Sequence, residues 1–195
     1  MTAAPKPVVC LFAGSSTPND PAIATTAKEL GRTLGQEGYD VVVGGAVGIM
    51  GIVATAARDA GAAVTIVAME KYAHEEILDG ATVLSVKSEA ERFQVFCSQP
   101  NLAAHIALPG GPGTMREVMQ GLEEAIYNNG VPVILAHAGD YMKGLRHFFD
   151  NAVAAGLVKP HFADRLKDWG TGDYITALIT PTGDTSGAAH AHTLK

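Results

Sequence analysis

Residues 107–117 read ALPGGPGTMRE and contain three glycines and two prolines within five positions. Such a cluster interrupts regular structure, because glycine adopts conformations that other residues avoid and proline cannot donate a backbone hydrogen bond. The apolar run AAHIAL leads into the cluster, and a helix-like pattern, TMREVMQGLEEAIYN, leads out of it. The stretch therefore predicts a buried strand, a glycine-rich turn and a helix in immediate succession.

The same order recurs along the chain, and its runs of Val, Ile and Ala are typical of strands buried on both faces. Strands that alternate with helices indicate βαβ units with right-handed crossovers. We expect an α/β fold, a single Rossmann-like domain at residues 1–182 with helices on both faces of a parallel sheet, and a disordered tail at 183–195. The expected strands are 7–13, 39–45, 63–69, 81–86, 103–111 and 131–137, and the expected helices are 21–36, 47–61, 88–98, 114–128 and 140–156.

Composition limits the possible functions. The 195 residues are 47% hydrophobic and 17% charged, which suits one globular domain, and the net charge of −6 argues against binding to nucleic acid or anionic membranes. No apolar run is long enough to span a membrane, and the N-terminal apolar segment is too short for a signal peptide, so we expect a cytoplasmic protein. Cys10 is expected in the core, and neither it nor Cys97 forms a metal-binding pattern. His190 and His192 could bind a metal, but we interpret them as part of a solvated tail.

Three glycine-rich loops follow expected strands: AGSS at 13–16, GGAVGIMG at 44–51 and PGGPGT at 109–114. Ligands of such folds bind outside the carboxyl ends of the strands, where a helix N-terminus offers free N–H groups to a phosphate. The alternative is that these glycines only form tight turns, but three such loops at one sheet edge favour a ligand site. The third loop predicts a phosphate cradle made by Gly110, Gly111, Gly113 and Thr114.

Familiar cofactor motifs do not fit. The chain has neither a GxxxxGK[ST] loop nor a GxGxxG fingerprint, which argues against a P-loop NTPase and a nicotinamide-dependent oxidoreductase. Pyridoxal-phosphate chemistry needs a Schiff-base lysine beside the cradle, and Lys71 has no supporting context. We therefore expect no cofactor and no metal.

The stretch PGGPGTMRE matches PGGxGTxxE, and on this motif the chain resembles the LONELY GUY (LOG) family of cytokinin-activating phosphoribohydrolases, often mislabelled as lysine decarboxylases. GSS at 14–16 is similar to the family's first loop, GGAVGIMG to its GGGxGxM loop, and residues 139–158 to a late segment. The resemblance implies a Rossmann-like homodimer with its site near the subunit interface. It also implies hydrolysis of a nucleoside 5′-monophosphate to free base and ribose 5-phosphate. The implied phosphate- and substrate-binding residues are Gly14, Ser15, Gly44, Gly45, Gly48, Met50, Gly110, Gly111, Gly113, Thr114 and Gln120.

Glu117 is the expected catalytic carboxylate. It lies three residues after Thr114, so both side chains share one face of the helix near its N-terminus. Cleavage of an N-glycosidic bond develops positive charge on the ribose. A nearby carboxylate can stabilise that charge or take a proton from the attacking water. A first-turn acid that only complements the helix dipole is the alternative interpretation of Glu117.

The second expected catalytic residue is the arginine of the family's M-x-x-R-K run, for which Arg92 is the candidate. Its guanidinium would bind phosphate or hold the sugar and the carboxylate. Phe93 replaces the lysine, and the methionine is absent. Arg92 also lies farther from Pro109 than the family spacing places it, so an alignment without gaps would select Gln94, whereas a short insertion near residues 99–101 restores Arg92.

Other positions leave the substrate open. Gln120 stands where the family often has a second acid, so we do not assume a prenylated adenine as the base. Another purine, a pyrimidine or a specialised biosynthetic nucleotide is also open. A second function also stays open, namely a carrier or sensor of a phosphorylated nucleotide-like ligand, similar to molybdenum-cofactor carrier proteins. His105 lies in an expected strand and is interpreted as a core residue. Lys71, Tyr72 and His74 follow the third expected strand and could line the site, but we interpret them as a surface loop.

Overall fold

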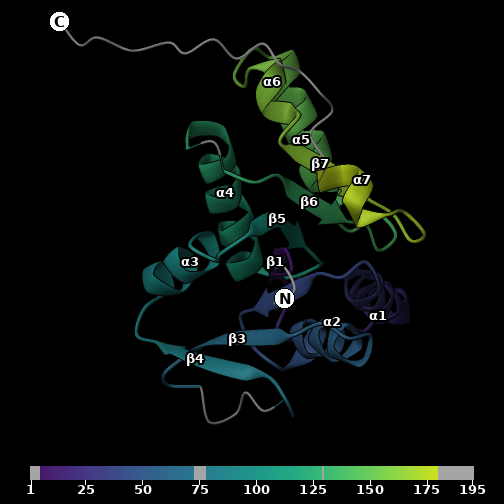
Figure 1. Ribbon diagram of the computed structural model, residues 1–195. Coiled ribbons are helices and arrows are strands. Elements are labelled where there is room, and N and C mark those ends of the chain that lie inside the picture. Colours follow the sequence, from purple (N-terminus) through teal and green to yellow (C-terminus); the bar gives the residue numbers. More distant parts are fainter. Residues whose placement is uncertain (1–4, 73–77, 129, 180–195) are drawn as a thin grey trace, which may run out of the picture.

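A computed structural model describes residues 5–72, 78–128 and 130–179 of the chain. It contains one seven-stranded parallel sheet with the strand order β4-β3-β2-β1-β5-β6-β7 (Figure 1). The strands are β1 (Val8–Phe12), β2 (Asp40–Val43), β3 (Val64–Met69), β4 (Thr82–Val86), β5 (Leu102–Ala107), β6 (Val133–Ala136) and β7 (Leu166–Trp169). The helices are α1 (Pro21–Gln36), α2 (Gly48–Asp59), α3 (Glu89–Cys97), α4 (Pro112–Tyr127), α5 (Lys143–Ala154), α6 (Pro160–Ala163) and α7 (Ile175–Ile179).

The predicted single Rossmann-like α/β domain is thus confirmed. The expected domain end at residue 182, the tail at 183–195 and the two histidines in that tail lie outside the described residues, as does His74.

The sheet has a separate apolar layer on each face. Along β1, Val9 and Leu11 face the layer that contains α1, α2 and α7, whereas Cys10 and Phe12 face the layer that contains α3, α4 and α5. This alternation follows from the two-residue period of a strand, and it requires central strands that are apolar at every position. The core position expected for Cys10 is confirmed, since its side chain is completely buried.

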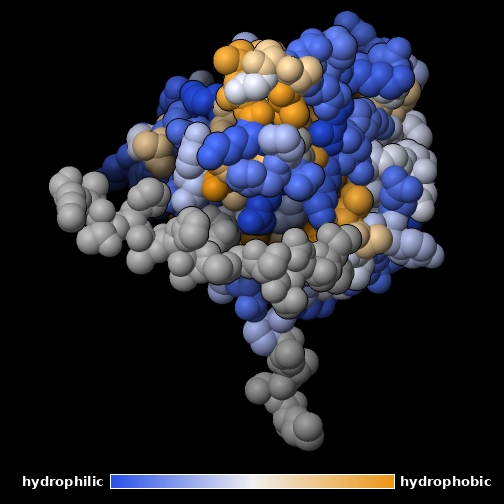
Figure 2. Space-filling model, turned by 90° about the horizontal axis from the view of Figure 1, so that it is seen from above, coloured by the Kyte–Doolittle hydropathy of each residue, from blue (hydrophilic) through white to orange (hydrophobic). Residues whose placement is uncertain are grey.

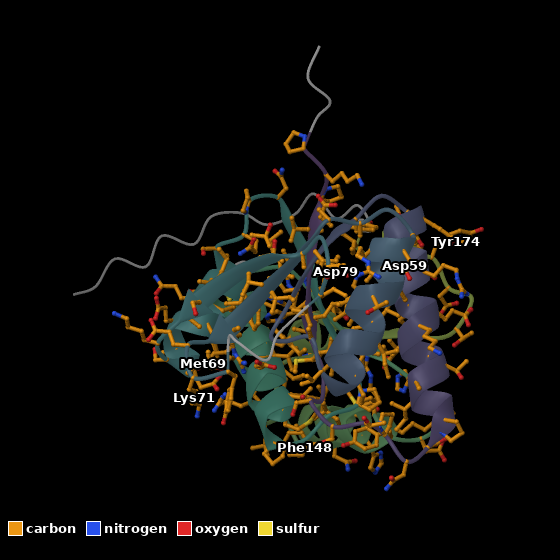
Figure 3. All side chains as sticks on the ribbon, turned by 90° about the horizontal axis from the view of Figure 1, so that it is seen from below. Asp59, Met69, Lys71, Asp79, Phe148 and Tyr174 are labelled. Carbon is orange, nitrogen blue, oxygen red and sulfur yellow. The ribbon has the colours of Figure 1, made fainter. Side chains whose placement is uncertain are left out.

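The order of the strands creates one position at which the connections of two neighbouring strands run in opposite directions. From β1 the chain adds β2, β3 and β4 toward one side, and it then returns to the other side of β1 to add β5, β6 and β7. Loops that leave neighbouring strands in opposite directions open a crevice at the carboxyl edge of the sheet, here between β1 and β5. Figure 3 labels Met69 and Lys71 together at the carboxyl end of β3, apart from Asp79, which precedes β4.

The sequence did not predict β7, α6 or α7. Strand β7 has only four residues, two of them charged, and it forms the edge of the sheet beside β6. Its apolar residues, Leu166 and Trp169, are buried while Lys167 and Asp168 are not. The short element therefore carried too little apolar pattern to be recognised, and pairing with β6 is what defines it.

The surface is largely hydrophilic on the face that Figure 2 displays, with hydrophobic side chains gathered in limited patches. Within the part of the chain that the structure describes, no helix is both long and apolar enough to cross a membrane.

Candidate functional site

A cavity of about 770 Å³ opens at the crevice between β1 and β5. Residues that follow β1, β2, β3 and β5 line it together with side chains from α3 and α4, which places three glycine-rich loops around one space. Of the predicted site residues, the cavity is lined by Gly14, Ser15, Gly44, Met50, Arg92, Gly110, Gly111, Gly113, Thr114 and Glu117. Gly45, Gly48 and Gln120 are not among the lining residues.

The first and third loops touch through their backbones. The N–H of Gly14 donates to the carbonyl of Pro109 over 3.1 Å. A Cβ atom on Gly110 would lie 2.1 Å from the Oγ1 of Thr114 and 2.9 Å from the backbone nitrogen of Gly14, so no larger residue fits without a shift of the loop. The glycine at position 110 is therefore required by close packing.

Gly48 has a similar spacing role in the second loop. Its φ angle is +57°, and a Cβ atom there would lie 2.3 Å from the carbonyl carbon of Ser15. The start of α2 consequently packs directly on the first loop, which holds Gly44 and Met50 at the cavity wall. Gly48 shapes the site although it does not line it.

The N-terminus of α4 lies at the cavity. The helix starts at Pro112 after the N-cap Gly111, which has no side chain to cap it. The first N–H groups of a helix have no acceptor within the helix, so those of Gly113 and Thr114 are available to a ligand at the positive end of the helix dipole. Both residues line the cavity, and this arrangement suits an anion such as a phosphate.

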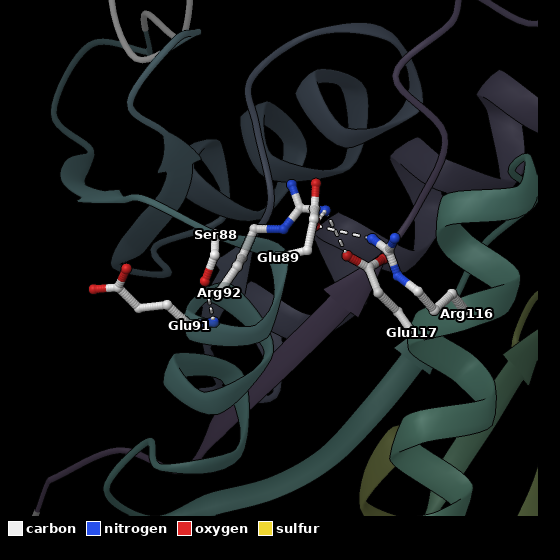
Figure 4. Close-up of polar contacts among 6 residues, drawn as sticks. All are labelled: Ser88, Glu89, Glu91, Arg92, Arg116 and Glu117. Atoms are coloured by element: carbon white, nitrogen blue, oxygen red, sulfur yellow. Dashed lines mark hydrogen bonds and ion pairs between the residues drawn. The ribbon is translucent and has the colours of Figure 1, made fainter.

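Glu117 lies one turn further along α4 and is buried, with 7% of its surface exposed. Its Oε1 accepts a hydrogen bond of 2.9 Å from Nη2 of Arg92, which comes from α3 (Figure 4). Burial raises the pKa of Glu117 to about 7, although the Arg92 charge opposes that rise. A carboxyl with this pKa can both accept and return a proton near neutral pH.

Two further charged residues extend this pair. Oε2 of Glu89 lies 2.8 Å from Nη2 of Arg92 and 2.9 Å from Nη2 of Arg116, so acids and arginines alternate across α3 and α4 (Figure 4). Ser88 caps α3, since its Oγ accepts from the N–H of Glu91 over 3.1 Å as the sequence spacing predicted. The cap fixes where α3 begins and thereby which side chains face the cavity.

The structure distinguishes Arg92 from Gln94 by position. Arg92 lines the cavity, whereas Gln94 is exposed and is absent from the lining. Phe93, which replaces the family's lysine, packs in the layer below α3 with its ring 6.5 Å from that of His105. A residue that packs there cannot offer a charge to the cavity.

His105 is a core residue, as expected from the sequence. It is 1% exposed and stacks on Phe12 with 4.9 Å between the ring centres. Burial lowers its pKa to about 4, and its Nδ1 has no hydrogen-bond partner within the described part of the chain. His105 is buried and is not among the residues that line the cavity, which agrees with its interpretation as a core residue and not a catalyst.

Sequence reasoning missed Glu89 and Tyr141, both of which line the cavity. The hydroxyl of Tyr141 donates a 2.6 Å hydrogen bond to the carbonyl of Gly110, which fixes one peptide of the cradle. Tyr72 lines the cavity, one of the two roles that the sequence left open for it, and it is 48% exposed. The spacing of Glu89 from Arg92, three residues on one helix, was a signal that could have found it.

The chain is similar to known proteins in both sequence and fold. The family model described as possible lysine decarboxylase matches residues 50–169. The chain is 35% identical over 155 residues to cytokinin riboside 5′-monophosphate phosphoribohydrolase LOG7 of Arabidopsis thaliana, over 78% of this chain and 71% of that protein. It is 34% identical over 158 residues to LOG1 of the same plant, over 78% of this chain and 72% of that protein.

Among solved structures, the molybdenum cofactor binding protein of Rippkaea orientalis is similar in fold. The TM-score is 0.64 at 20% sequence identity, and the match covers 91% of this chain and 97% of that protein. At this identity the likeness concerns the fold alone.

Proposed function

The chain belongs to the LONELY GUY family, and from that premise we propose that it hydrolyses the N-glycosidic bond of a nucleoside 5′-monophosphate to free base and ribose 5-phosphate. The observation that carries the proposal is the placement of Glu117 in one cavity with the cradle. A buried carboxyl and free helix N–H groups at one helix end suit a substrate that joins a phosphate to a reacting sugar.

In the proposed reaction the phosphate binds the N–H groups of Gly111, Gly113 and Thr114. This anchors the ribose near Glu117, whose negative charge stabilises the positive charge that develops as the bond to the base lengthens. Water attacks C1′ and gives one proton to Glu117, while the C1′–N bond breaks and the base leaves. The raised pKa of Glu117 allows it to hold that proton and pass it to the departing base.

Arg92 has two tasks in this scheme. Its Nη2 holds the Glu117 carboxylate in place, while its Nη1 lies 3.3 Å from the position that a Cβ atom on Gly44 would occupy. The guanidinium therefore reaches across the cavity from α3 toward the loop after β2. We propose that Nη1 donates to the ribose or the phosphate.

The test is a chromatographic assay for free base. The protein is incubated with a panel of nucleoside 5′-monophosphates, the matching nucleosides and N6-substituted AMPs, with and without chelator. We expect base release from monophosphates only, unaffected by chelator and reduced by about 10²–10⁴-fold in Glu117→Gln, the range typical of a lost general acid–base.

Arg92→Ala and Gln94→Ala form a matched pair in the same assay. We expect Arg92→Ala to lose most of the activity and Gln94→Ala to retain it, because only Arg92 lines the cavity. Activity that survives Arg92→Ala but not Gln94→Ala contradicts the assignment of the arginine.

The second candidate function is a carrier or sensor of a phosphorylated nucleotide-like ligand. Gln120 favours it, since a neutral amide stands one turn beyond Glu117, although it does not line the cavity. Tight calorimetric binding of a monophosphate without release of any base would select this function over hydrolysis.

We also propose that the protein is a homodimer. A groove of about 420 Å³ lies between α4 and α5, and its wall includes Met119, Tyr141 and Phe148, which are 41%, 52% and 57% exposed. In addition, α5 has no fully buried residue. An apolar surface of this kind beside the cavity supports a subunit interface.

A further inference from the structure

Both carboxylates next to Arg92 use the same nitrogen. Nη2 lies 2.9 Å from Oε1 of Glu117 on α4 and 2.8 Å from Oε2 of Glu89 on α3. Two carboxylates on different helices, one hydrogen-bonded to Nη2 and the other ion-paired with it, restrict the orientation of the guanidinium. Its other terminal nitrogen, Nη1, is directed to the Gly44 side of the cavity.

The first turn of α3 contains two acids with different surroundings. Glu91 turns back along the chain, where its Oε2 accepts the backbone N–H of Lys87 over 2.8 Å. Glu89 lies at the cavity, and its Oε2 contacts Arg92 and Arg116 (Figure 4). A general preference for acids at a helix N-terminus applies to both residues equally, so it does not explain why Glu89 contacts the two arginines.

We propose that Glu89 is a positioning residue that fixes the guanidinium of Arg92 between α3 and α4. In this position Nη1 is presented to the ligand, and Nη2 is shared by Glu89 and Glu117 instead of pairing with Glu117 only. This role deepens the proposed hydrolase function and rests on it for its catalytic consequence. The geometry of the two ion pairs carries it.

The charges near Glu117 determine the direction in which its pKa changes when Glu89 is neutralised. The charged residues that affect Glu117 are Arg92 and Glu89 on α3 and Arg116 on α4. The charge of Glu89 raises the pKa of Glu117, whereas the two arginines lower it. Neutralising Glu89 removes one repulsive charge and leaves Arg92 to pair with Glu117 alone, so both effects lower the pKa of Glu117.

The experiment compares Glu89→Gln with Glu91→Gln. Both variants remove one negative charge from the same helix turn, and glutamine retains the capping function at position 91. The first readout is the pH dependence of kcat/KM for base release, together with KM for the monophosphate. The second readout needs no activity: the titration of the Glu117 carboxyl is followed by carbon NMR of selectively labelled glutamate, with Glu117→Gln assigning the signal.

We expect Glu89→Gln to move the acid limb of kcat/KM and the NMR titration of Glu117 to lower pH. We also expect it to raise KM for the monophosphate by roughly threefold to tenfold, the size of a partly exposed charged contact. Glu91→Gln should change neither quantity. Equal behaviour of the two variants, or an unchanged titration of Glu117 in Glu89→Gln, overturns the proposal.

The two proposals fail in different ways. If the wild-type protein releases no base from any monophosphate, the hydrolase function is wrong. The NMR titration, together with calorimetric binding of ribose 5-phosphate to the two variants, then still decides whether Glu89 positions Arg92.

Discussion

Arg92 on α3 and Glu117 on α4 form an ion pair of 2.9 Å, although 25 positions separate them along the chain. Their side chains are 16% and 10% exposed, so the pair lies largely out of water at the wall of the cavity. A shielded pair of this kind is costly to form and sensitive to the loss of either partner, which makes it a good target for measurement.

The rate of base release should depend on the ionisation of Glu117. Burial raises the pKa of this group to about 7, and the proposed reaction needs its ionised form to accept a proton from water. We therefore expect kcat/KM to fall about tenfold for each pH unit below that value. Steady-state kinetics from pH 5 to pH 8 check this, and the residual rate of Glu117→Gln should lack the same limb.

The stability of the protein should depend on pH in the opposite direction, because of the same group. The pKa of Glu117 is about 7 in the folded protein and 4.5 as its ordinary value, so the folded state retains a proton that the unfolded chain loses over that interval. The free energy of unfolding therefore decreases as pH rises from about 4.5 to about 7. Urea unfolding of wild type and Glu117→Gln should show a difference that changes across this range. Glu123→Gln, an exposed acid on the same helix, is the control, and a difference that stays constant with pH contradicts the prediction.

The glycines of the cradle should respond differently to alanine. A Cβ atom at position 110 would collide with Thr114, so Gly110→Ala should lower the melting temperature by overpacking, at a cost of about 1–3 kcal/mol. A Cβ atom at position 113 meets nothing within 4 Å, and alanine there should stabilise α4 by up to about 1 kcal/mol.

Gly113→Ala should nevertheless bind ribose 5-phosphate more weakly, because the added methyl group would stand where we propose that the phosphate binds at the helix end. Calorimetric titration and thermal melting of both variants provide the check. Higher stability with unchanged affinity in Gly113→Ala would show that this glycine serves only the turn.

Removal of the Tyr141 hydroxyl should weaken recognition of the phosphate. Tyr141→Phe keeps the ring but loses the 2.6 Å hydrogen bond to the carbonyl of Gly110, which frees a peptide of the cradle. We expect KM for monophosphates to rise by about fivefold, equivalent to a hydrogen bond of about 1 kcal/mol, with little change in kcat. Tyr174→Phe, at a tyrosine that is 73% exposed, serves as the control. A fall in kcat alone argues against this role.

The dimer proposal can be tested on α5. Phe148→Asp places a charge in the apolar groove between α4 and α5 and should weaken self-association by at least about tenfold. Tyr174→Asp changes an exposed aromatic residue on another part of the molecule (Figure 3) and should leave the association unchanged. Sedimentation equilibrium of the three proteins measures the effect. A monomeric wild type, or equal weakening by both variants, contradicts the interface.

The sequence alone determined much of this protein, because the relevant signals are local. Apolar runs that alternate with amphipathic helices predicted the parallel sheet, and the carboxyl edge of that sheet collects the glycine-rich loops whatever the details of packing. The relation between the cradle and Glu117 was also visible, since three residues on one helix fix their shared face.

Tertiary structure decided the rest, because those features depend on distances between elements that lie far apart in the chain. Whether Arg92 or Gln94 reaches the cavity is set by the rotation and position of α3 against α4, which the uncertain spacing to Pro109 could not provide. The contact of Tyr141 with Gly110 joins residues 31 positions apart, and the edge strand β7 exists through its pairing with β6. Local patterns fix which face of an element is apolar, whereas only packing between elements fixes which polar side chains meet.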